Sequence, residues 1–423
     1  MKLLIVGGGG REHALAWKLS QSPVIDELFC APGNAGIGEL AVCLDIEATD
    51  IASIIAFVKE QKVDFVVVGP EQPLAMGIAD EITKLGVPVF GPTSAAAELE
   101  SSKAYAKELM KRAGIPTAPY QVFDDSNAAK SFAETMKGPW VVKADGLAAG
   151  KGVLICMTLD EAKAAIDDVL EKRIFNDAGI KIVIEEFLDG EELSIMAFCD
   201  GKTVLPMASA QDHKRIFDGD KGLNTGGMGA YSPAPIATPE VVDDVKRRIL
   251  EPIVEELNKD GRIFKGVLYA GLMLTKNGPM VIEFNVRFGD PETQVVLPRL
   301  KTDLFEIMKA VTETRLDEME ISWLPDSCVS VVMASEGYPG AYRKGDEITG
   351  LDNMPSEILI FHSGTTQDGS GRILTNGGRV LAATALGKTI ESAVETVYDG
   401  VRKISFAGAH YRNDIAKRGL RID

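Results

Sequence analysis

Short apolar runs alternate with helical patterns through the first hundred residues. Leu3–Val6, Phe65–Val68 and Val87–Phe90 are apolar runs that end at glycine or at Gly-Pro. Buried runs of this length, separated by helices of about 10–15 residues, are typical of βαβ units in a parallel sheet. The pattern therefore predicts an N-terminal α/β unit. Ligands of such sheets bind beyond the carboxyl ends of the strands, which is where the glycines lie.

The pattern changes after residue 100. A helix is expected over Ser102–Ala113, closed by Gly114, with prolines beyond it that indicate a hinge. Further strands are predicted at Trp140–Val142, Gly152–Cys156 and Ile182–Glu186, and a helix near Pro239–Leu257. A last unit begins near Ser327, and its final helix carries an apolar stripe at helical spacing, formed by Ile390, Val394, Val397 and Val401.

Composition narrows the class of protein. The chain has 423 residues, enough for about three domains, with 45% apolar and 25% charged residues, which is ordinary for a globular protein. A formal charge of −17 argues against a general nucleic-acid or anionic-membrane binder. The apolar start stops at Gly7, too short for a signal peptide, and no later run would span a bilayer. The five cysteines (Cys30, Cys43, Cys156, Cys199, Cys328) are widely spaced, as expected of reduced thiols in a cytoplasmic protein.

The stretch from Met280 to Gln294 carries the strongest chemical signal. In a strand, Glu283, Asn285 and Arg287 share one face because they lie two residues apart. Oxygen ligands from Glu and Asn suit Mg²⁺, and an arginine beside them suits phosphate or carboxylate oxygens. The alternative is a solvated face of an amphipathic strand. The Phe-Gly-Asp-Pro-Glu that follows argues against it.

A glycine run, Gly7–Gly10, follows the first strand and opens a helix with Arg11, Glu12 and His13. Backbone N–H groups there can approach an anion, aided by the helix N-terminus. Dinucleotide binding is the alternative, but the third glycine of the usual fingerprint is missing. A single phosphate is favoured, with Arg11 assisting, and His13 is expected to pack the helix. Glu71, at the end of another strand, either hydrogen-bonds sugar hydroxyls or is a solvated loop residue.

One further segment suggests a nucleotide site, and another suggests a functional loop. Lys143 lies in an apolar strand and needs an anion to keep its charge. The glycine-rich stretch 146–152 that follows is expected to be a flexible lid over nucleotide phosphates. Residues 211–231 read as a loop of about 20 residues that mixes charges and glycines; loops of that length are usually functional or disordered, and its order-promoting residues favour function.

These motifs, taken in order, resemble the phosphoribosylamine–glycine ligase family of ATP-grasp enzymes. The matching stretches are Gly-Gly-Gly-Gly-Arg-Glu-His at 7–13, Asp-His-Lys-Arg at 212–215, Asn-Thr-Gly-Gly-Met-Gly-Ala-Tyr-Ser-Pro at 224–233, and Glu-Phe-Asn-Val-Arg-Phe-Gly-Asp-Pro-Glu-Thr-Gln at 283–294. The likeness covers essentially the whole chain. Leu223, where a proline is expected, and Ser101, where glycine is commoner, are small departures at positions without chemistry.

The resemblance implies a fold with four parts: a parallel-sheet α/β N-terminal domain (1–100), a central ATP-grasp domain (101–119 with 191–325), an α+β lid (120–190) and a small α+β C-terminal domain (326–423). It also implies a reaction. ATP phosphorylates the carboxylate of glycine, and the amine of 5-phosphoribosylamine displaces the phosphate. The products are glycinamide ribonucleotide, ADP and phosphate, in purine biosynthesis, and the cofactors are ATP with Mg²⁺ or Mn²⁺.

The resemblance also assigns roles to residues. Metal ligands would be Glu283 and Asn285, and catalytic residues Arg287, Lys143 and Asp212. ATP contacts would be Lys103, Lys143, Gly150, Lys151, Gly152, Glu185, Glu186, Leu188 and Glu192. Substrate contacts would be Gly8, Gly9, Gly10, Arg11, Glu71, Asn224, Thr225, Gly226 and Gly227.

The sequence leaves other functions open. The nearest is another purine-pathway ATP-grasp ligase, either a carboxylase or a formate-dependent transformylase. An NAD-dependent oxidoreductase and a non-catalytic nucleotide sensor are more distant alternatives. Small-molecule substrates are the only expected partners, without nucleic acid or membrane. A monomer is expected, with a weak dimer as the alternative.

Overall fold

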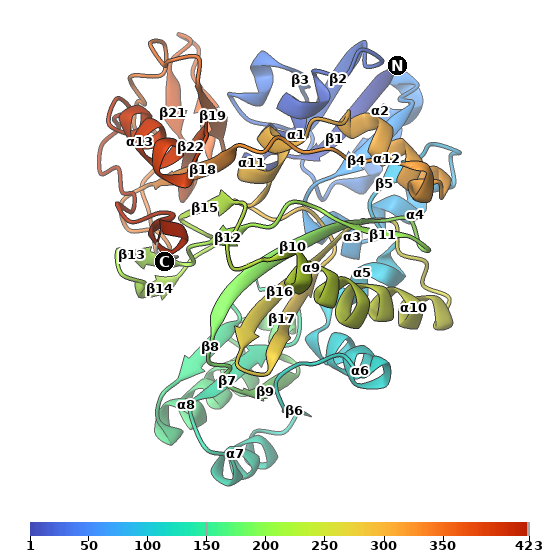
Figure 1. The fold of residues 1–423 in the computed structure, drawn as a ribbon, viewed down its shortest axis with the longest axis vertical. Helices are drawn as coiled ribbons and strands as arrows, with labels where there is room; N and C mark the ends of the chain where they lie inside the picture. Colours follow the sequence, from blue (N-terminus) through green and yellow to red (C-terminus); the bar gives the residue numbers. More distant parts are fainter. Residues whose placement is uncertain (149–150, 421–423) are drawn as a thin grey trace.

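The computed structural model describes residues 1–148 and 151–420. Its N-terminal part is a five-stranded parallel sheet (Figure 1). In sheet order the strands are β3 (Val42–Cys43), β2 (Glu27–Pro32), β1 (Lys2–Gly7), β4 (Phe65–Val68) and β5 (Val89–Phe90). The predicted parallel sheet is thus confirmed, although β5 is shorter than the apolar run that predicted it. Pro88, which precedes β5, has no N–H to donate to a neighbouring strand.

Helices cover both faces of this sheet: α1 (Gly10–Leu19), α2 (Ile51–Gln61), α3 (Glu71–Ala75), α4 (Ile78–Thr83) and α5 (Ser94–Ser101). Alternate residues of β1 belong to different clusters. Leu4 and Val6 lie in the cluster that contains α2 and α4, whereas Leu3 and Ile5 lie in the one that contains α1. Burial on both faces explains why the strands read as continuous apolar runs.

The next helix, α6 (Lys103–Ala113), has the predicted ends. The Ser102 side chain accepts a hydrogen bond from the N–H of Tyr105, and Gly114 closes the helix with a left-handed φ of 66°. The chain then enters an antiparallel sheet in the order β6 (Tyr120–Phe123), β9 (Ile182–Glu186), β7 (Trp140–Ala144) and β8 (Val153–Cys156). Helices α7 (Ser126–Thr135) and α8 (Leu159–Leu170) pack against it in a separate hydrophobic cluster.

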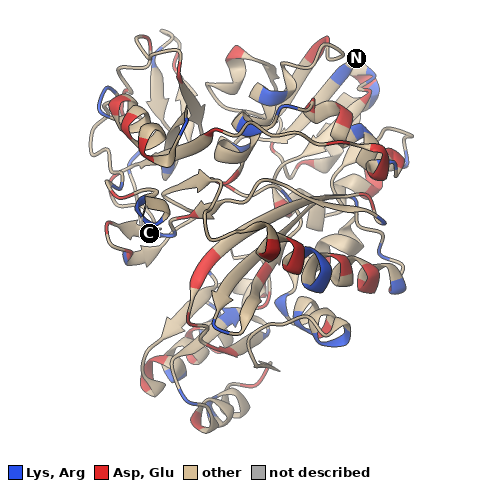
Figure 2. Ribbon diagram, viewed as in Figure 1, with Lys and Arg blue, Asp and Glu red and all other residues tan. Residues whose placement is uncertain are grey.

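The central sheet is antiparallel, in the order β11 (Val204–Pro206), β10 (Glu191–Cys199), β16 (Gly266–Thr275) and β17 (Gly278–Asn285). The helix expected near Pro239–Leu257 is a continuous run of α9 (Pro239–Val245), a π-helical turn (Lys246–Leu250) and α10 (Glu251–Lys259). Acidic and basic positions are interspersed along it (Figure 2), with ion pairs one turn apart such as Arg247–Asp243 at 2.8 Å. After β17 come α11 (Thr293–Val296) and α12 (Leu304–Glu313).

The segment 211–231 is not the irregular loop that its composition predicts. It contains β12 (Gln211–Asp212), a hairpin of β13 (Arg215–Phe217) and β14 (Lys221–Asn224), and β15 (Gly229–Ser232). Strands β12 and β15 extend the C-terminal sheet, whose order is β12, β15, β18 (Ser327–Ala334), β22 (Arg379–Gly387) and β19 (Ile358–His362). The prediction failed because the partner strand β18 lies about a hundred residues further along the chain. A small hairpin, β20 (Thr365–Gln367) with β21 (Ile373–Thr375), and α13 (Ile390–Val401) complete this part.

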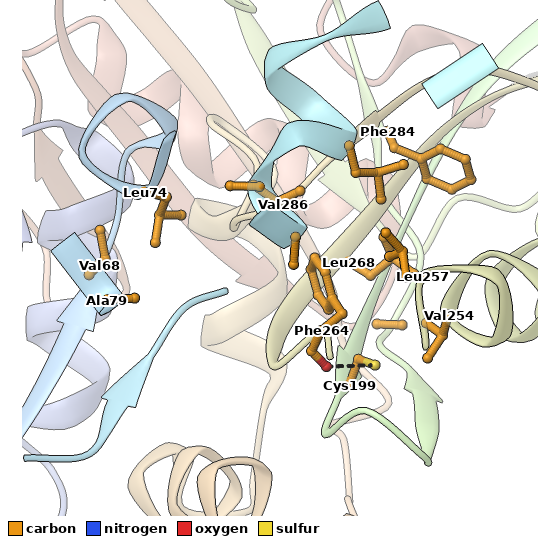
Figure 3. Packing of buried hydrophobic residues seen from close by; sticks show 14 of the residues in the cluster. Val68, Leu74, Ala79, Cys199, Val254, Leu257, Phe264, Leu268, Phe284 and Val286 are labelled. Carbon is orange, nitrogen blue, oxygen red and sulfur yellow. Dashed lines mark hydrogen bonds between the residues drawn. The ribbon is translucent and has the colours of Figure 1, made fainter. Parts of the chain in front are cut away.

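One hydrophobic cluster joins the N-terminal sheet to the central sheet. Figure 3 shows Val68 of the N-terminal sheet with Leu74 of α3 and Ala79 of α4. It also shows Leu268 and Phe284 of the central sheet with Phe264 and Val286, which lie just outside its strands. The thiol of Cys199 donates to the Phe264 carbonyl at 3.4 Å, and all five cysteines are free. Shared burial of this kind fixes the N-terminal loops relative to β17. Within residues 1–148 and 151–420, no helix has the length and apolar character needed to cross a membrane.

His13 packs α1 against the C-terminal sheet, as predicted. Its Nδ1 accepts the backbone N–H of His362 at 2.8 Å, and its ring meets Phe361 edge-on with centroids 5.7 Å apart. Burial, and then the neighbouring His362, lower the pKa of His13 from 6.5 to about 3. The imidazole is therefore neutral in the folded protein above about pH 3.

This buried imidazole predicts a loss of stability in mild acid. Below pH 6.5 the unfolded chain binds a proton at His13 that the folded chain excludes down to about pH 3, so the stability falls as the pH falls through that window. His13→Asn keeps an acceptor for the His362 N–H and removes this proton. Thermal unfolding midpoints measured between about pH 7 and pH 5 should fall less steeply in the variant than in the wild type. Parallel curves would contradict a neutral, buried His13.

Candidate active site

A cavity of about 610 Å³ lies between the sheet of the predicted lid (β6, β9, β7 and β8), helices α5 and α6, and strands β16 and β17. Most side chains that the sequence singled out line it, and they come from segments spread over more than two hundred residues, from Glu71 to Arg287. Its wall is apolar on the lid side, where Val141, Val153 and Ile155 lie, and densely charged opposite. An apolar slot that opens onto paired charges is the shape expected for a nucleotide.

Strand β17 places the predicted metal and anion ligands on the cavity wall. Phe284 and Val286 are buried in the hydrophobic cluster, and the alternate residues Glu283, Asn285 and Arg287 line the cavity. A guanidinium nitrogen of Arg287 donates to Asn285 Oδ1 at 3.2 Å. The solvated-face alternative is therefore wrong. Arg287 lies two residues beyond the strand end at Asn285, yet it keeps the same facing.

Arg287 is held between two carboxylates. It lies 3.1 Å from Glu71 Oε2 and 3.1 Å from Glu100 Oε1, while the other Glu100 oxygen accepts the Val286 N–H at 2.7 Å. Burial opposes ionisation of Glu71, but Arg287 and Arg11 outweigh it and lower its pKa to about 2. Deeper burial raises the pKa of Glu100 to about 7 despite Arg287. Glu71 is thus a cavity residue and not a solvated loop residue.

The buried ammonium group of Lys143 is paired with a carboxylate, as its burial requires. Its Nζ lies 3.0 Å from Glu185 Oε1 and donates to the Ile282 carbonyl of β17 at 2.9 Å. Lys107 pairs with the other Glu185 oxygen at 3.0 Å. Burial, offset in part by Glu185, lowers the pKa of Lys107 to about 8. Two buried ammonium groups therefore share one carboxylate, and the cluster is ready to accept a further anion.

Residues 145 and 146 of the predicted lid are hydrogen-bonded to α6 beside these lysines. The Asp145 carboxylate accepts the N–H of Ala104 at 2.7 Å, and the Lys103 Nζ donates to the Gly146 carbonyl at 3.3 Å. Burial lowers the pKa of Lys103 despite the opposing attraction of Glu283, and repulsion from Lys143 adds to the lowering. Glu283 itself is buried, but Lys214, Lys143 and Lys103 outweigh that and lower its pKa. Glu283 is therefore anionic, as a metal ligand must be.

The segment from Glu185 to Glu192, which was predicted to contact ATP, borders the same cavity. Glu186, Leu188 and Glu192 line it, and the Glu186 N–H donates to the Pro119 carbonyl at 3.0 Å. Glu192 pairs with Lys214 at 3.0 Å. In the lid loop Gly152 lines the cavity and Lys151 is exposed, whereas Gly150, with residue 149, lies outside the described residues.

Asp212 belongs to a second group of buried polar side chains. It lies 4.0 Å from Lys214, and burial, reinforced by Glu292 and Glu192, raises its pKa to about 7. Behind it, Tyr269 donates to Glu292 Oε1 at 2.6 Å. Both Tyr269 and Glu292 line the cavity.

The glycine loop after β1 adjoins the cavity without lining it. A side chain at Gly8 would lie 2.5 Å from the Gly33 carbonyl, so only glycine fits. Within the loop, Glu12 accepts from the Gly9 N–H at 2.7 Å and from Arg11 Nε at 2.6 Å. Arg11 is thus buried and internally paired. The loop meets the cavity at Asp290, whose Oδ2 would lie 3.6 Å from a Cβ on Gly9.

The second substrate segment reaches the cavity more directly. Asn224, Thr225 and Gly226 line it, and Gly227 packs against Pro291 with a φ of 110°. A side chain on Gly227 would come within 2.4 Å of the proline ring, which explains the glycine. The structure therefore brings the 224–227 segment and the 283–294 segment together.

Several residues of the site were not found from the sequence: Glu100, Lys107, Lys214, Tyr269, Asp290 and Glu292. Lys107 could have been inferred, because it lies one helical turn after Lys103 on α6. Lys214 could also have been inferred, because it lies two residues after Asp212. Glu100 and Tyr269 sit in ordinary helix and strand patterns, and only the tertiary structure reveals them.

The residues present fit a divalent cation with shared ligands. Glu283 and Asn285 offer hard oxygen atoms on one wall. Within the described part of the chain, no three His, Cys, Asp or Glu side chains are grouped so as to hold a metal by themselves. A cation here would need further oxygen atoms from bound phosphates and water, which is the coordination that Mg²⁺ prefers.

Comparison with known proteins agrees with this geometry. The chain matches the phosphoribosylglycinamide synthetase N domain over residues 1–100, the ATP-grasp (A) domain over 101–293 and the C domain over 328–418. It is 50% identical over 421 residues to a phosphoribosylamine–glycine ligase of Neisseria meningitidis, covering 99% of this chain and 100% of that one. It is 49% identical to the Rhizobium meliloti ligase over 420 residues, covering 99% of each.

Solved structures extend the comparison. The phosphoribosylamine–glycine ligase of Thermotoga maritima superposes with a TM-score of 0.85 at 34% identity, covering 98% of this chain and all of that one. A Campylobacter jejuni biotin carboxylase bound to an ATP analogue superposes with a TM-score of 0.74 at 16% identity, covering 97% and 92%; at that identity only the fold is shared. The chain belongs to the phosphoribosylglycinamide synthetase family of ATP-grasp enzymes.

Proposed function

We propose that the protein joins glycine to 5-phosphoribosylamine at the expense of ATP, giving glycinamide ribonucleotide, ADP and phosphate in purine biosynthesis. The observation that carries the proposal is the placement of Glu283, Asn285 and Arg287 across one cavity from Lys103 and Lys143. A metal pair of oxygens faces two ammonium groups, which is the arrangement that a transferred phosphoryl group requires. Relatives that share half of the residues over the full length are named for this reaction.

The nucleotide end of the cavity is assigned to the lid side. The adenine is proposed to lie against Val141, Val153 and Ile155 near the backbone of Glu185–Leu188, and Glu192 to hold the ribose. Lys103 and Lys143 would bind the phosphates, with Lys143 exchanging Glu185 for a phosphate oxygen. Gly150, Lys151 and Gly152 would cover them from the lid, which is proposed to span residues 120–190.

The metal is proposed to be Mg²⁺ or Mn²⁺, held by Glu283 and Asn285. When bound, it would neutralise charge on the phosphates. Arg287 would hold the carboxylate of glycine or the phosphoryl group in transfer, because its guanidinium already spans two carboxylates and can exchange one for a substrate. Cationic groups that are already in position before the reaction stabilise the charge that develops in the transition state. The barrier is lower because the site does not have to reorganise.

The other end of the cavity is assigned to the substrates. Phosphoribosylamine would be bound by the 8–11 loop with Glu71, and the 224–227 segment would close over it. Its amine attacks the acyl phosphate and must then lose a proton. Asp212, with its pKa raised to about 7 by burial, is proposed to accept it, since a group with that pKa exchanges protons near neutral pH. Arg11 would act by ordering the loop through Glu12.

The proposed reaction predicts that ADP release requires both small substrates. With Mg²⁺ and ATP, purified enzyme should release ADP rapidly only when glycine and phosphoribosylamine, generated in place, are both present. Replacing glycine with bicarbonate or formate separates the alternatives, because those are the acids used by the related carboxylase and transformylase. Rapid ADP release with either acid in place of glycine would overturn the assignment.

The proposed metal site predicts a severe and local defect in Glu283→Gln. The amide keeps the shape but loses the charge that holds the cation, so turnover should fall on the order of 10²-fold or more, as when other transition-state charge contacts are removed. The unfolding midpoint should change little. Glu255→Gln, an exposed glutamate on α10, is the matched control and should keep wild-type turnover. Near-normal turnover of Glu283→Gln at saturating Mg²⁺ would show that the metal lies elsewhere.

A further inference from the structure

One side chain of the C-terminal sheet contacts two residues of the cavity wall, Gly226 and Asp290. Arg379, the first residue of β22, lies in neither of the segments assigned to substrates, and its side chain is only 19% exposed. Its Nη1 donates to the Gly226 carbonyl at 2.8 Å and to the Asp290 carbonyl at 3.0 Å. Its Nη2 lies 3.2 Å from Asp290 Oδ2. A single guanidinium thus bonds two segments that are more than sixty residues apart in the chain.

Both segments depend on this guanidinium for their backbone partners. Gly226 lines the cavity. Its backbone N–H donates at 3.1 Å to the hydroxyl of Tyr338, which also belongs to the C-terminal part. The guanidinium packs closely on Gly226, because a Cβ there would lie 3.0 Å from Arg379 Cζ. Without Arg379, two carbonyls and one carboxylate in a half-buried place would lose their donor, which is costly.

The charges of the pair reinforce each other. Burial disfavours the charge on Asp290, but Arg379 and then Arg11 outweigh it and lower its pKa. Burial likewise disfavours the charge on Arg379, and Asp290 outweighs it and raises the pKa of the guanidinium. The other Asp290 oxygen accepts the Gln294 side-chain N–H at 2.8 Å. Asp290 is therefore a fixed anion with both oxygens occupied by the protein.

The same place adjoins the glycine loop of the N-terminal part. A Cβ on Gly9 would lie 3.6 Å from Asp290 Oδ2, and one on Gly10 would lie 2.7 Å from Gln294 Nε2 and 2.5 Å from Ser363 Oγ. The N-terminal, central and C-terminal parts of the chain thus meet around Arg379 and Asp290. The junction lies at the phosphoribosylamine end of the cavity and away from the lid.

We propose that Arg379 is a positioning residue for phosphoribosylamine: its guanidinium holds the 224–227 segment and the Asp290 turn at the separation that closes the substrate end of the cavity. It touches no reacting atom and acts through the carbonyls of Gly226 and Asp290. The inference rests on the proposed function only for the identity of the substrate, phosphoribosylamine. A guanidinium suits this place because its Nη1 reaches the carbonyls of Gly226 and Asp290 while its Nη2 reaches the Asp290 carboxylate. An ammonium has one nitrogen and cannot occupy both positions.

Arg379→Met and Arg379→Lys test the proposal, with Arg372→Met as the matched control. Arg372 is an arginine of the same part of the chain, 56% exposed and paired with Asp368. For Arg379→Met the KM for phosphoribosylamine should rise at least about tenfold, with the KM for ATP within about twofold of wild type. Arg379→Lys should lie between, because its single nitrogen can replace Nη1 or Nη2 but not both. Arg372→Met should match the wild type in every parameter.

Amide exchange gives a readout that needs no substrate. Exchange in 224–229 and 288–294 should quicken in Arg379→Met and remain unchanged in Arg372→Met. If Arg379 merely stabilised the fold, the unfolding midpoint would fall and kcat would drop with the folded fraction, leaving each KM unchanged; that result would overturn the proposal. An unchanged exchange rate in both segments would also overturn it. If the wild type did not use phosphoribosylamine, the proposed function would fail, and the exchange comparison would still decide whether Arg379 holds the two segments.

Discussion

Buried charges in this protein must be paired, and the site is organised around that requirement. An ammonium or guanidinium group taken out of water is tolerated only beside a carboxylate or a similar acceptor. Lys143 and Lys107 share Glu185, Arg287 lies between Glu71 and Glu100, and Arg379 is bonded to Asp290. Each pairing brings side chains from different segments to one place. A substrate with phosphate or carboxylate groups can replace a protein carboxylate in these pairs without leaving a cation bare.

The scaffold makes such pairs possible by keeping rigid parts behind them. Phe284 and Val286 are anchored in the cluster that also holds the N-terminal sheet, so the alternate residues of the same segment face the cavity with little freedom. The lid has its own hydrophobic cluster and touches the rest of the site through polar contacts such as Asp145 with α6 and Lys143 with Ile282. Polar contacts exchange more readily than a shared core. The lid is therefore the part best suited to move when a nucleotide binds.

The sequence predicted those features that depend on neighbours in the chain. The period of two in β17 was enough to place Glu283, Asn285 and Arg287 on one face, and the cap residues Ser102 and Gly114 were enough to bound α6. Features that depend on partners distant in the sequence were not predicted. Strands β12 and β15 of segment 211–231 join a sheet only because β15 pairs with β18, and Arg379 matters only because Gly226 and Asp290 lie beside it. Arg11 is an intermediate case: the loop was recognised, but the pairing of Arg11 with Glu12 was not.

The central claim is that the cavity brings the terminal phosphate of ATP onto the carboxylate of glycine. Oxygen tracing tests it most directly. If glycine labelled with ¹⁸O in its carboxylate is converted with phosphoribosylamine and ATP, the acyl phosphate must leave one glycine oxygen on the phosphate. Mass spectrometry of the released inorganic phosphate should therefore show a single ¹⁸O atom in each molecule formed. Unlabelled phosphate, with product formed at the same rate, would contradict the account.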